Sequence, residues 1–221
     1  MIIRKYGLVL KRLQKKDLEL VRTKRNQRSV RGHMFYQKTI SKLDQEKWFD
    51  SINNIYNYYF LIQLKNESIG LINGKNIDYE KRESEGGIFI WKNSPEISTA
   101  AAIASIIMAE LTFKIFRFNT TYAFVKSSNV KQQIYNEKLG YQLINENKKE
   151  KKLTYVLTSK NYKLKGTKIL RAIGIVTRDH SEISWSDIDF SNVNPDTYTK
   201  QYTHLPSDIQ TMIDQYILKS K

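Results

Sequence analysis

The sequence predicts an α+β fold in which a mixed, mostly antiparallel sheet is flanked by helices. Two patterns predict it: short runs that alternate apolar and polar residues, as half-buried strands do, and longer runs whose apolar residues recur at helical spacing. The predicted order along the chain is β-α-α-β-β-β-α-β-α-β-β. The chain has 221 residues, of which 40% are hydrophobic, so it is long enough for one good-sized core and a small appendage.

The first part of the chain predicts one strand and two helices. Residues 7–13 alternate as a half-buried strand does, and residues 17–25 place their apolar side chains on one helical face. A second helix is expected over residues 41–54. Ser41 begins this stretch, acidic residues follow it closely, and apolar residues then recur at helical spacing.

Three strands and a long helix follow. Residues 58–65, 68–77 and 84–91 are strand-like runs separated by short polar turns, which indicates an antiparallel meander. The stretch 98–116 is rich in helix formers and apolar enough to be largely buried.

The last predicted elements complete a domain that we place at residues 1–160. They are a strand at 120–126, a helix at 130–139, and two strands near 141–146 and 152–158. The domain therefore ends on a pair of strands.

Residues 161–221 are expected to form a C-terminal extension of unknown role. Within them, residues 205–218 predict a helix, capped by Ser207 or Asp208. Four apolar residues share one face of this helix: Ile209, Met212, Ile213 and Tyr216. That face is expected to dock onto the domain or onto a second subunit, so a homodimer stays open.

Composition excludes several classes of site. The chain has no cysteine, which rules out disulfides, thiolate nucleophiles and cysteine metal sites. Its three histidines lie far apart and show no metal-ligand spacing, so we expect no metal. The opening residues 1–13 carry charges within their apolar run, and the longest apolar stretch is too short to span a membrane. We therefore expect a soluble, cytoplasmic protein with no membrane partner.

The net charge of +15 is concentrated near the start of the chain. Residues 1–50 hold 14 Lys and Arg against 5 Asp and Glu, a surplus of 9. Such a surplus attracts anionic partners, or it is simply a solvated basic surface. Nucleic acid is the weaker partner prediction, because no zinc finger, Arg/Gly-rich tract or aromatic-basic pattern is present.

The segment VKSSNVKQQIYNEKLGYQL at 125–143 resembles the GNAT superfamily of N-acetyltransferases. In that family two central strands splay apart, and the pantetheine arm of CoA lies in the opening. The resemblance implies acetyl-CoA as the donor, with Asn129 contacting CoA. It also implies that Tyr135 protonates the departing thiolate, a role suited to a phenol, which is neutral at pH 7. The alternative is that Tyr135 only packs a helix face.

A second resemblance covers residues 21–49. This segment is similar to GNAT enzymes that acetylate nucleotide-linked amino sugars, notably those of pseudaminic acid synthesis, although Lys24 and Lys47 replace the usual Trp and His. There it walls the acceptor pocket. The resemblance implies that a nucleotide sugar contacts Arg25, Asn26, Arg31, Met34 and Phe35. Guanidinium groups pair well with a diphosphate, but an ordinary basic helix and loop explains the pattern equally well.

A third resemblance concerns the CoA pyrophosphate, which GNAT enzymes bind on backbone N–H groups at a helix start. The corresponding positions here are Ser98, Thr99, Ala100 and Ala101, where Thr99 stands in place of a glycine and no Arg or Gln precedes it. These residues are expected either to bind phosphate or simply to cap the helix.

The strand at 84–91 supplies the remaining candidates. In the resembling enzymes an acidic residue on this strand faces the acceptor, so Glu85 is a candidate base, or else a carboxylate paired with Lys or Arg. Ile88, Phe89 and Ile90 are expected to pair their backbone with pantetheine as a neighbouring strand would.

Together these resemblances imply direct transfer of an acetyl group from acetyl-CoA to a primary amine. With no cysteine and no evident Ser-His pair, no covalent enzyme intermediate is expected. The expected acceptor is a nucleotide-linked amino sugar of a surface-glycan pathway. Two alternatives stay open: a protein N-terminus, as in ribosomal-protein acetyltransferases, and a degenerate domain that serves as a binding module.

Overall fold

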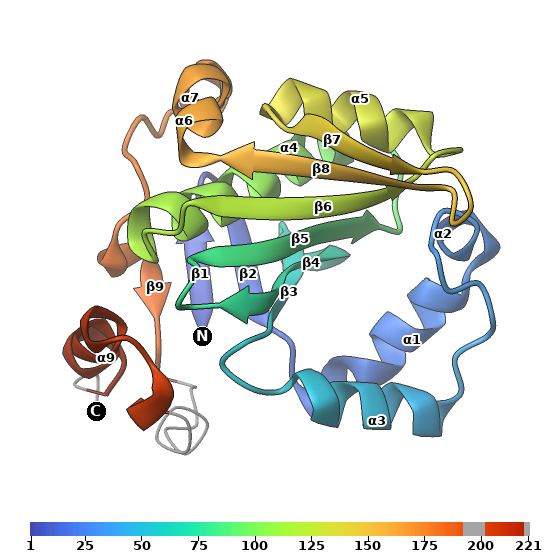
Figure 1. Ribbon diagram of the computed structural model, residues 1–221, viewed down its shortest axis with the longest axis horizontal. Helices are drawn as coiled ribbons and strands as arrows, with labels where there is room; N and C mark the ends of the chain where they lie inside the picture. Colours follow the sequence, from blue (N-terminus) through green and yellow to red (C-terminus); the bar gives the residue numbers. More distant parts are fainter. Residues whose placement is uncertain (192–201, 219–221) are drawn as a thin grey trace.

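The computed structural model describes residues 1–191 and 202–218. Their strands form one sheet in the order β7-β8-β6-β5-β4-β3-β2-β1-β9 (Figure 1). All neighbouring strands are antiparallel except β5 and β6, which are parallel, so the predicted mixed, mostly antiparallel sheet is confirmed. The strands are β1 (Ile2–Lys5), β2 (Leu8–Arg12), β3 (Tyr58–Leu64), β4 (Glu67–Asp78), β5 (Glu83–Ile90), β6 (Thr120–Lys126), β7 (Gln142–Asn147), β8 (Lys152–Thr158) and β9 (Ile188–Asp189).

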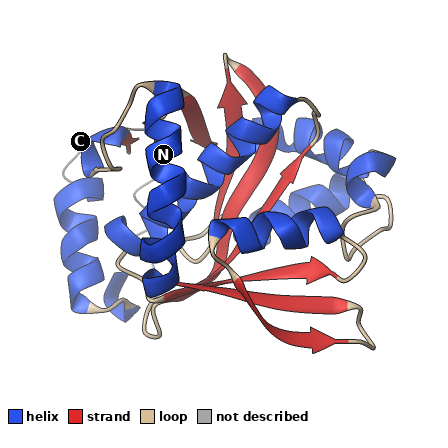
Figure 2. Ribbon diagram, turned by 90° about the horizontal axis from the view of Figure 1, so that it is seen from above, coloured by secondary structure: helices blue, strands red, loops and turns tan. Residues whose placement is uncertain are grey.

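Helices lie on both sides of these strands, which fan apart when seen from above (Figure 2). One side is covered by α1 and α3, whose apolar residues join those of β3 and β4 in a small cluster. The other side is covered by α4, which packs in the main core. The α-helices are α1 (Leu18–Asn26), α2 (Arg28–Arg31), α3 (Lys42–Ile52), α4 (Pro95–Glu110), α5 (Val130–Leu139), α6 (Ser159–Asn161), α7 (Thr167–Thr177) and α9 (Ser207–Ile213).

The start of the chain is a hairpin, where the sequence predicted a single strand. β1 and β2 are joined by a two-residue turn, Tyr6 and Gly7, both with positive φ (52° and 77°). Turns of this kind usually contain Asn-Gly or Asp-Gly, so Tyr-Gly gave no turn signal. The prediction was therefore wrong about β1, although β2 lies where it was expected.

Two local motifs fix helices at their predicted places. The Ser41 side chain accepts a hydrogen bond from the Asp44 backbone, and Asp44 returns one, so a capping box begins α3. Asn129 caps α5 by accepting from the Gln132 backbone. Gly140 ends α5 at φ 103°, a left-handed conformation that glycine adopts without steric cost.

Helix α4 begins at Pro95, three residues earlier than predicted. The Ser94 side chain caps it by accepting from the Ile97 backbone, and proline at the first helical position is already shaped for a helix. This Ser-Pro start is the signal that the prediction passed over. Residues 95–115, including the wider turn at 111–115, are apolar and long enough to cross a membrane by length and composition alone. The burial of this helix in the main core accounts for its apolar composition.

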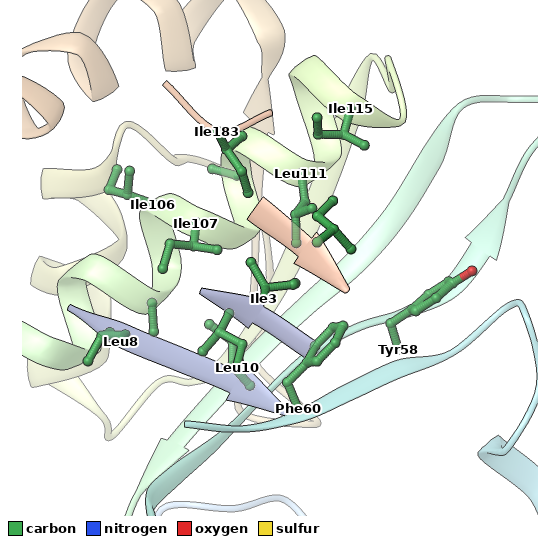
Figure 3. Close-up of a cluster of buried hydrophobic side chains, with 14 of the residues drawn as sticks. Ile3, Leu8, Leu10, Tyr58, Phe60, Ile106, Ile107, Leu111, Ile115 and Ile183 are labelled. Carbon is green, nitrogen blue, oxygen red and sulfur yellow. The ribbon is translucent and has the colours of Figure 1, made fainter. Parts of the chain in front are cut away.

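The C-terminal extension packs into the main core. Eight of its side chains belong to the main cluster: Tyr162, Ile173, Ile183, Ile188, Phe190, Leu205, Ile209 and Ile213. Figure 3 shows Ile183 with Ile106 of α4 and Leu111 of the wider turn that follows α4, all in the same core cluster. β9 pairs with β1, and the Arg82 side chain donates to Asp208 at 2.6 Å. The boundary at residue 160 stays a prediction, but this packing argues that the extension stabilises the domain.

The helix predicted near the end of the chain is present as α9. It starts after Pro206 without a side-chain cap, so neither Ser207 nor Asp208 caps it. Its apolar face docks onto the domain through Ile209 and Ile213, the first of the two docking partners expected for it.

Candidate active site

The central feature of the sheet is a fork between β5 and β6. The two strands pair only from Glu83 with Thr120 to Glu85 with Tyr122. Beyond that point β5 continues along β4 and β6 continues along β8, so the strands separate. Gly86 and Gly87 follow the last paired residue of β5, and neither has a side chain to fill the fork. The splayed central pair expected from the sequence is confirmed.

A cavity of about 1130 Å³ occupies this fork. Its walls come from β5, β6, α4 and α5, and from the loop after α2. The cavity is lined by all three residues that were proposed to pair with pantetheine, Ile88, Phe89 and Ile90. Strand alternation places Ile88 and Ile90 against the main core on the α4 side, and Phe89 against the cluster under α1 and α3. The cavity therefore reaches both sides of the sheet.

Tyr135 lies on α5 and lines the cavity. Its hydroxyl donates to the Ala101 carbonyl at 2.9 Å and lies 2.6 Å from the Ser105 hydroxyl, both on α4. Because the Tyr135 proton is directed at Ala101, the Ser105 hydroxyl is the donor in the second bond. Burial raises the pKa of Tyr135 well above its usual range, while the Ser105 hydrogen bond lowers it. Tyr135 is therefore a neutral phenol at physiological pH, and its proton must turn from the Ala101 carbonyl before it can reach another acceptor.

Sequence reasoning missed two residues beside Tyr135. Ser105 faces it across the cavity from the middle of α4, where a lone serine in an apolar helix carries no local signal. Tyr141 also lines the cavity, and burial raises its pKa to about 12. Both were found only because the fold brings them to Tyr135.

Asn129 lines the cavity at the start of α5. Its side-chain oxygen is used as the helix cap, 3.3 Å from the Gln132 nitrogen. The side-chain amide nitrogen or the backbone of Asn129 would therefore make the proposed contact with CoA. This contact stays a prediction.

At the start of α4, several donors that the resemblance assigned to the pyrophosphate are used within the helix. Pro95 has no N–H group, the Ile97 N–H is taken by the Ser94 cap, and the Ser98 N–H bonds the Ser94 carbonyl. The hydroxyls of Ser98 and Thr99 likewise donate to helix carbonyls. Few donors remain free for an anion.

Of the four residues proposed there, two line the cavity and two do not. Ser98 and Ala101 are on its wall, whereas Ala100 packs in the main core and Thr99 lies outside the lining. The four residues sit in the second turn of α4 because the helix starts three residues earlier than expected. Their role toward CoA stays a prediction.

Glu85 also lines the cavity, where it is paired. Its carboxylate lies 2.5 Å from the Lys75 ammonium on the neighbouring strand, and its other oxygen accepts from the Asn76 side chain at 2.8 Å. Both oxygens are thus occupied. A role as base would require the Lys75 pair to open.

The loop between α2 and α3 forms the mouth of the cavity. Met34 and Phe35 line it together with His33, and Phe35 is 49% exposed. This agrees with the proposed acceptor contacts of Met34 and Phe35, which themselves stay predictions.

Arg25, Asn26 and Arg31 are outside the cavity lining and hold this loop in place. Arg25 donates to the Tyr36 carbonyl at 2.9 Å, and Arg31 to the Thr39 hydroxyl at 2.7 Å. Asn26 exchanges two hydrogen bonds with the Ile40 backbone. Burial, and then the charge of Arg31, lower the pKa of Arg25. Their proposed contact with the acceptor stays a prediction.

Comparison with known proteins identifies the family. The model of the acetyltransferase (GNAT) domain matches residues 7–142. A search of curated protein sequences finds no match.

Solved structures share the fold at low sequence identity. A spermidine N-acetyltransferase from Vibrio cholerae, in complex with CoA and spermine, matches with a TM-score of 0.62 at 20% identity, covering 72% of this chain and 99% of that one. Apo FdhC, a nucleotide-linked sugar GNAT, matches with a TM-score of 0.65 at 19% identity, covering 79% of this chain and 99% of that one. At these identities the likeness shows the fold alone. The family match spans well over half of the chain, so the protein belongs to the GNAT acetyltransferases and uses acetyl-CoA as its acetyl donor.

Proposed function

We propose that this protein acetylates the primary amine of a nucleotide-linked amino sugar, with Tyr135 as general acid. The observation that carries the choice of acceptor is the charge of the cavity wall. Five lysines line it, Lys75, Lys92, Lys126, Lys131 and Lys152, against two glutamates, Glu85 and Glu150.

This charge favours an anionic acceptor over a polyamine. The ion pairs of Lys75 with Glu85 and of Lys92 with Glu67 leave Lys126, Lys131 and Lys152 against Glu150 on the wall. A polyamine carries several positive charges, and each would face lysines with few carboxylates to pair with. A nucleotide sugar carries a negative diphosphate and matches the same wall. The two solved structures are equally distant from this chain, so the choice between their acceptors rests on this charge.

The mechanism follows from the side chains at the fork. The cavity holds the acceptor amine near the acetyl group, so that the amine lone pair forms the new C–N bond as the C–S bond breaks. Tyr135 then gives its proton to the departing thiolate sulfur. As the negative charge passes to Tyr135, the Ser105 hydroxyl stabilises it through the 2.6 Å hydrogen bond. The excess proton of the amine passes to a base, for which Glu85 stays the candidate.

A panel of acceptors tests this proposal. UDP-, GDP- and dTDP-linked amino sugars are compared with spermidine and with a peptide that has a free N-terminus, and free CoA is measured. We expect kcat/KM for at least one nucleotide sugar to exceed that for spermidine by about 100-fold, an amount that corresponds to about 2.7 kcal/mol. Faster turnover of spermidine or of the peptide would refute the proposed acceptor.

A further inference from the structure

Two lysines face each other across the end of the β6–β8 pair. Lys126 of β6 is directly opposite Lys152 of β8 in the antiparallel register. Side chains at directly opposite positions have Cβ atoms about 4.5–5.5 Å apart, and like charges at such positions repel. The repulsion between these two ammonium groups lowers the stability of the folded protein.

Both lysines lie on the acceptor side of the cavity. Along β6, Ala123 and Val125 are buried in a cluster with β8, so Lys126 points to the opposite face together with Phe124. The Lys126 ammonium lies 3.5 Å from the Gly32 carbonyl, in the segment where α2 meets its loop. Figure 1 shows α2 below the β7–β8 hairpin, consistent with this contact. Lys152 sits over the Phe124 ring, with its ammonium 4.0 Å from the ring centroid.

Neither lysine is neutralised by the described part of the chain. Their contacts are a carbonyl and an aromatic ring, and neither makes an ion pair with a carboxylate of residues 1–191 or 202–218. By contrast, two other lysines of the wall are paired, Lys75 with Glu85 and Lys92 with Glu67. The charge of Lys126 and Lys152 therefore stays available to a ligand.

We propose that Lys126 and Lys152 bind the diphosphate of the acceptor, an inference that rests on the proposed function. Two ammonium groups on one strand pair, at the edge of the cavity and beside the acceptor loop, fit a dianionic group that bridges them. The Phe124 ring, over which Lys152 sits, offers apolar surface next to it. Arg25 and Arg31, by contrast, donate hydrogen bonds within their own loop and lie outside the cavity wall, although Arg25 Nη1 has no partner among the described residues.

Calorimetric titration with UDP, GDP and dTDP tests the site without relying on turnover. The variants are Lys126→Ala, Lys152→Ala and the double variant, with Lys160→Ala as a control that removes the same charge from an exposed position outside the wall. We expect each single variant to weaken binding of the best nucleotide about tenfold, and the double variant about 100-fold. Lys126→Arg keeps the charge and is expected to retain affinity, and Lys160→Ala to change it less than twofold.

Melting temperature shows that the variants stay folded, and it is expected to be unchanged or slightly higher because a repulsion is removed. Unchanged nucleotide affinity in the double variant, an equal loss in Lys160→Ala, or no nucleotide binding by the wild type would each overturn the inference.

The lysine site and the proposed acceptor can be refuted separately. Acetylation of a nucleotide sugar with an unchanged KM in the double variant refutes only the lysine site. Lysine-dependent nucleotide binding without acetylation of any nucleotide sugar refutes only the proposed acceptor.

Discussion

Buried polar groups differ between the cavity and the junction where the C-terminal extension packs on the domain. At the junction, the fully buried Glu110 accepts from the Tyr6 hydroxyl, the Lys114 ammonium and the Ile183 backbone. Around the cavity, buried polar atoms lack partners within the described residues: Asn73 Oδ1, Asn136 Nδ2 and the hydroxyl of Tyr162, which belongs to the C-terminal extension; Arg25 Nη1, outside the cavity lining, lacks one as well. Buried polar groups are nearly always paired when their role is structural. Asn73 Oδ1 and Asn136 Nδ2 are therefore the cavity atoms for which a bound ligand would supply the missing partner.

The largest effect is expected from removing the tail after Lys160. Eight of its side chains leave the main core, and each apolar side chain buried contributes roughly 1.5–3 kcal/mol as an upper estimate. That sum is on the order of 10 kcal/mol, comparable with the whole stability of a domain. We expect circular dichroism to show no cooperative melt. A truncated protein that melts near the full-length temperature would instead support a domain that ends at residue 160.

The next largest effect is expected from Tyr135→Phe on turnover. The change removes the proton donor and keeps the ring, so kcat should fall by about 10²- to 10⁴-fold while the KM for acetyl-CoA shifts little. Loss of the bonds to Ala101 and Ser105 should cost about 0.5–1.5 kcal/mol each, which lowers the melting temperature by several degrees. A kcat within about twofold of wild type would remove Tyr135 from the mechanism.

Glu110→Gln should lower stability and leave turnover unchanged, whereas the main effect of Tyr135→Phe is on turnover. An amide has one oxygen, so its NH2 group faces either the Lys114 ammonium or the pair formed by the Tyr6 hydroxyl and the Ile183 N–H, and in either case the charge that pairs with Lys114 is lost. We expect a loss of about 1–3 kcal/mol in the free energy of unfolding, with kcat of the folded fraction unchanged. The measurement is urea denaturation alongside kinetics. A fall in kcat without loss of stability would mean that the junction takes part in catalysis.

The smallest effect is expected from Ser105→Ala. Without its hydroxyl the developing phenolate loses one donor, so kcat should fall by up to about tenfold, equivalent to about 1.4 kcal/mol, with little change in KM. Combining Ser105→Ala with Tyr135→Phe tests whether the two act as a unit, because the second change should then add almost nothing. Fully additive effects would show that Ser105 acts independently of Tyr135.

Local signals predicted the elements that form the cavity. The fork between β5 and β6 was implied by the family resemblance alone, and the Asn129 cap was not predicted, but the meander strands and the helix after Asn129 lie where their local patterns placed them. Their patterns are short in range, so residues close in sequence were enough to predict them.

Features that depend on distant contacts were not predictable in the same way. Ile183 packs in the core with α4, and Ile188 pairs with β1. These contacts join residues far apart in sequence, so the spacing of apolar residues does not predict them. Likewise, the opposition of Lys126 and Lys152 depends on strand register, which tertiary packing sets. The early start of α4 is different, because Ser94 and Pro95 carried a readable local signal.

Hydrogen exchange with and without acetyl-CoA tests the contrast between cavity and tail most directly. If the fork binds the donor, peptides covering residues 86–90 of β5 and 130–139 of α5 should exchange more slowly when acetyl-CoA is added, because unpaired backbone of β5 gains a partner. Peptides covering residues 183–190 should be protected already and should not change. Unchanged exchange at 86–90 in saturating acetyl-CoA, or protection gained only in the tail, would contradict the account.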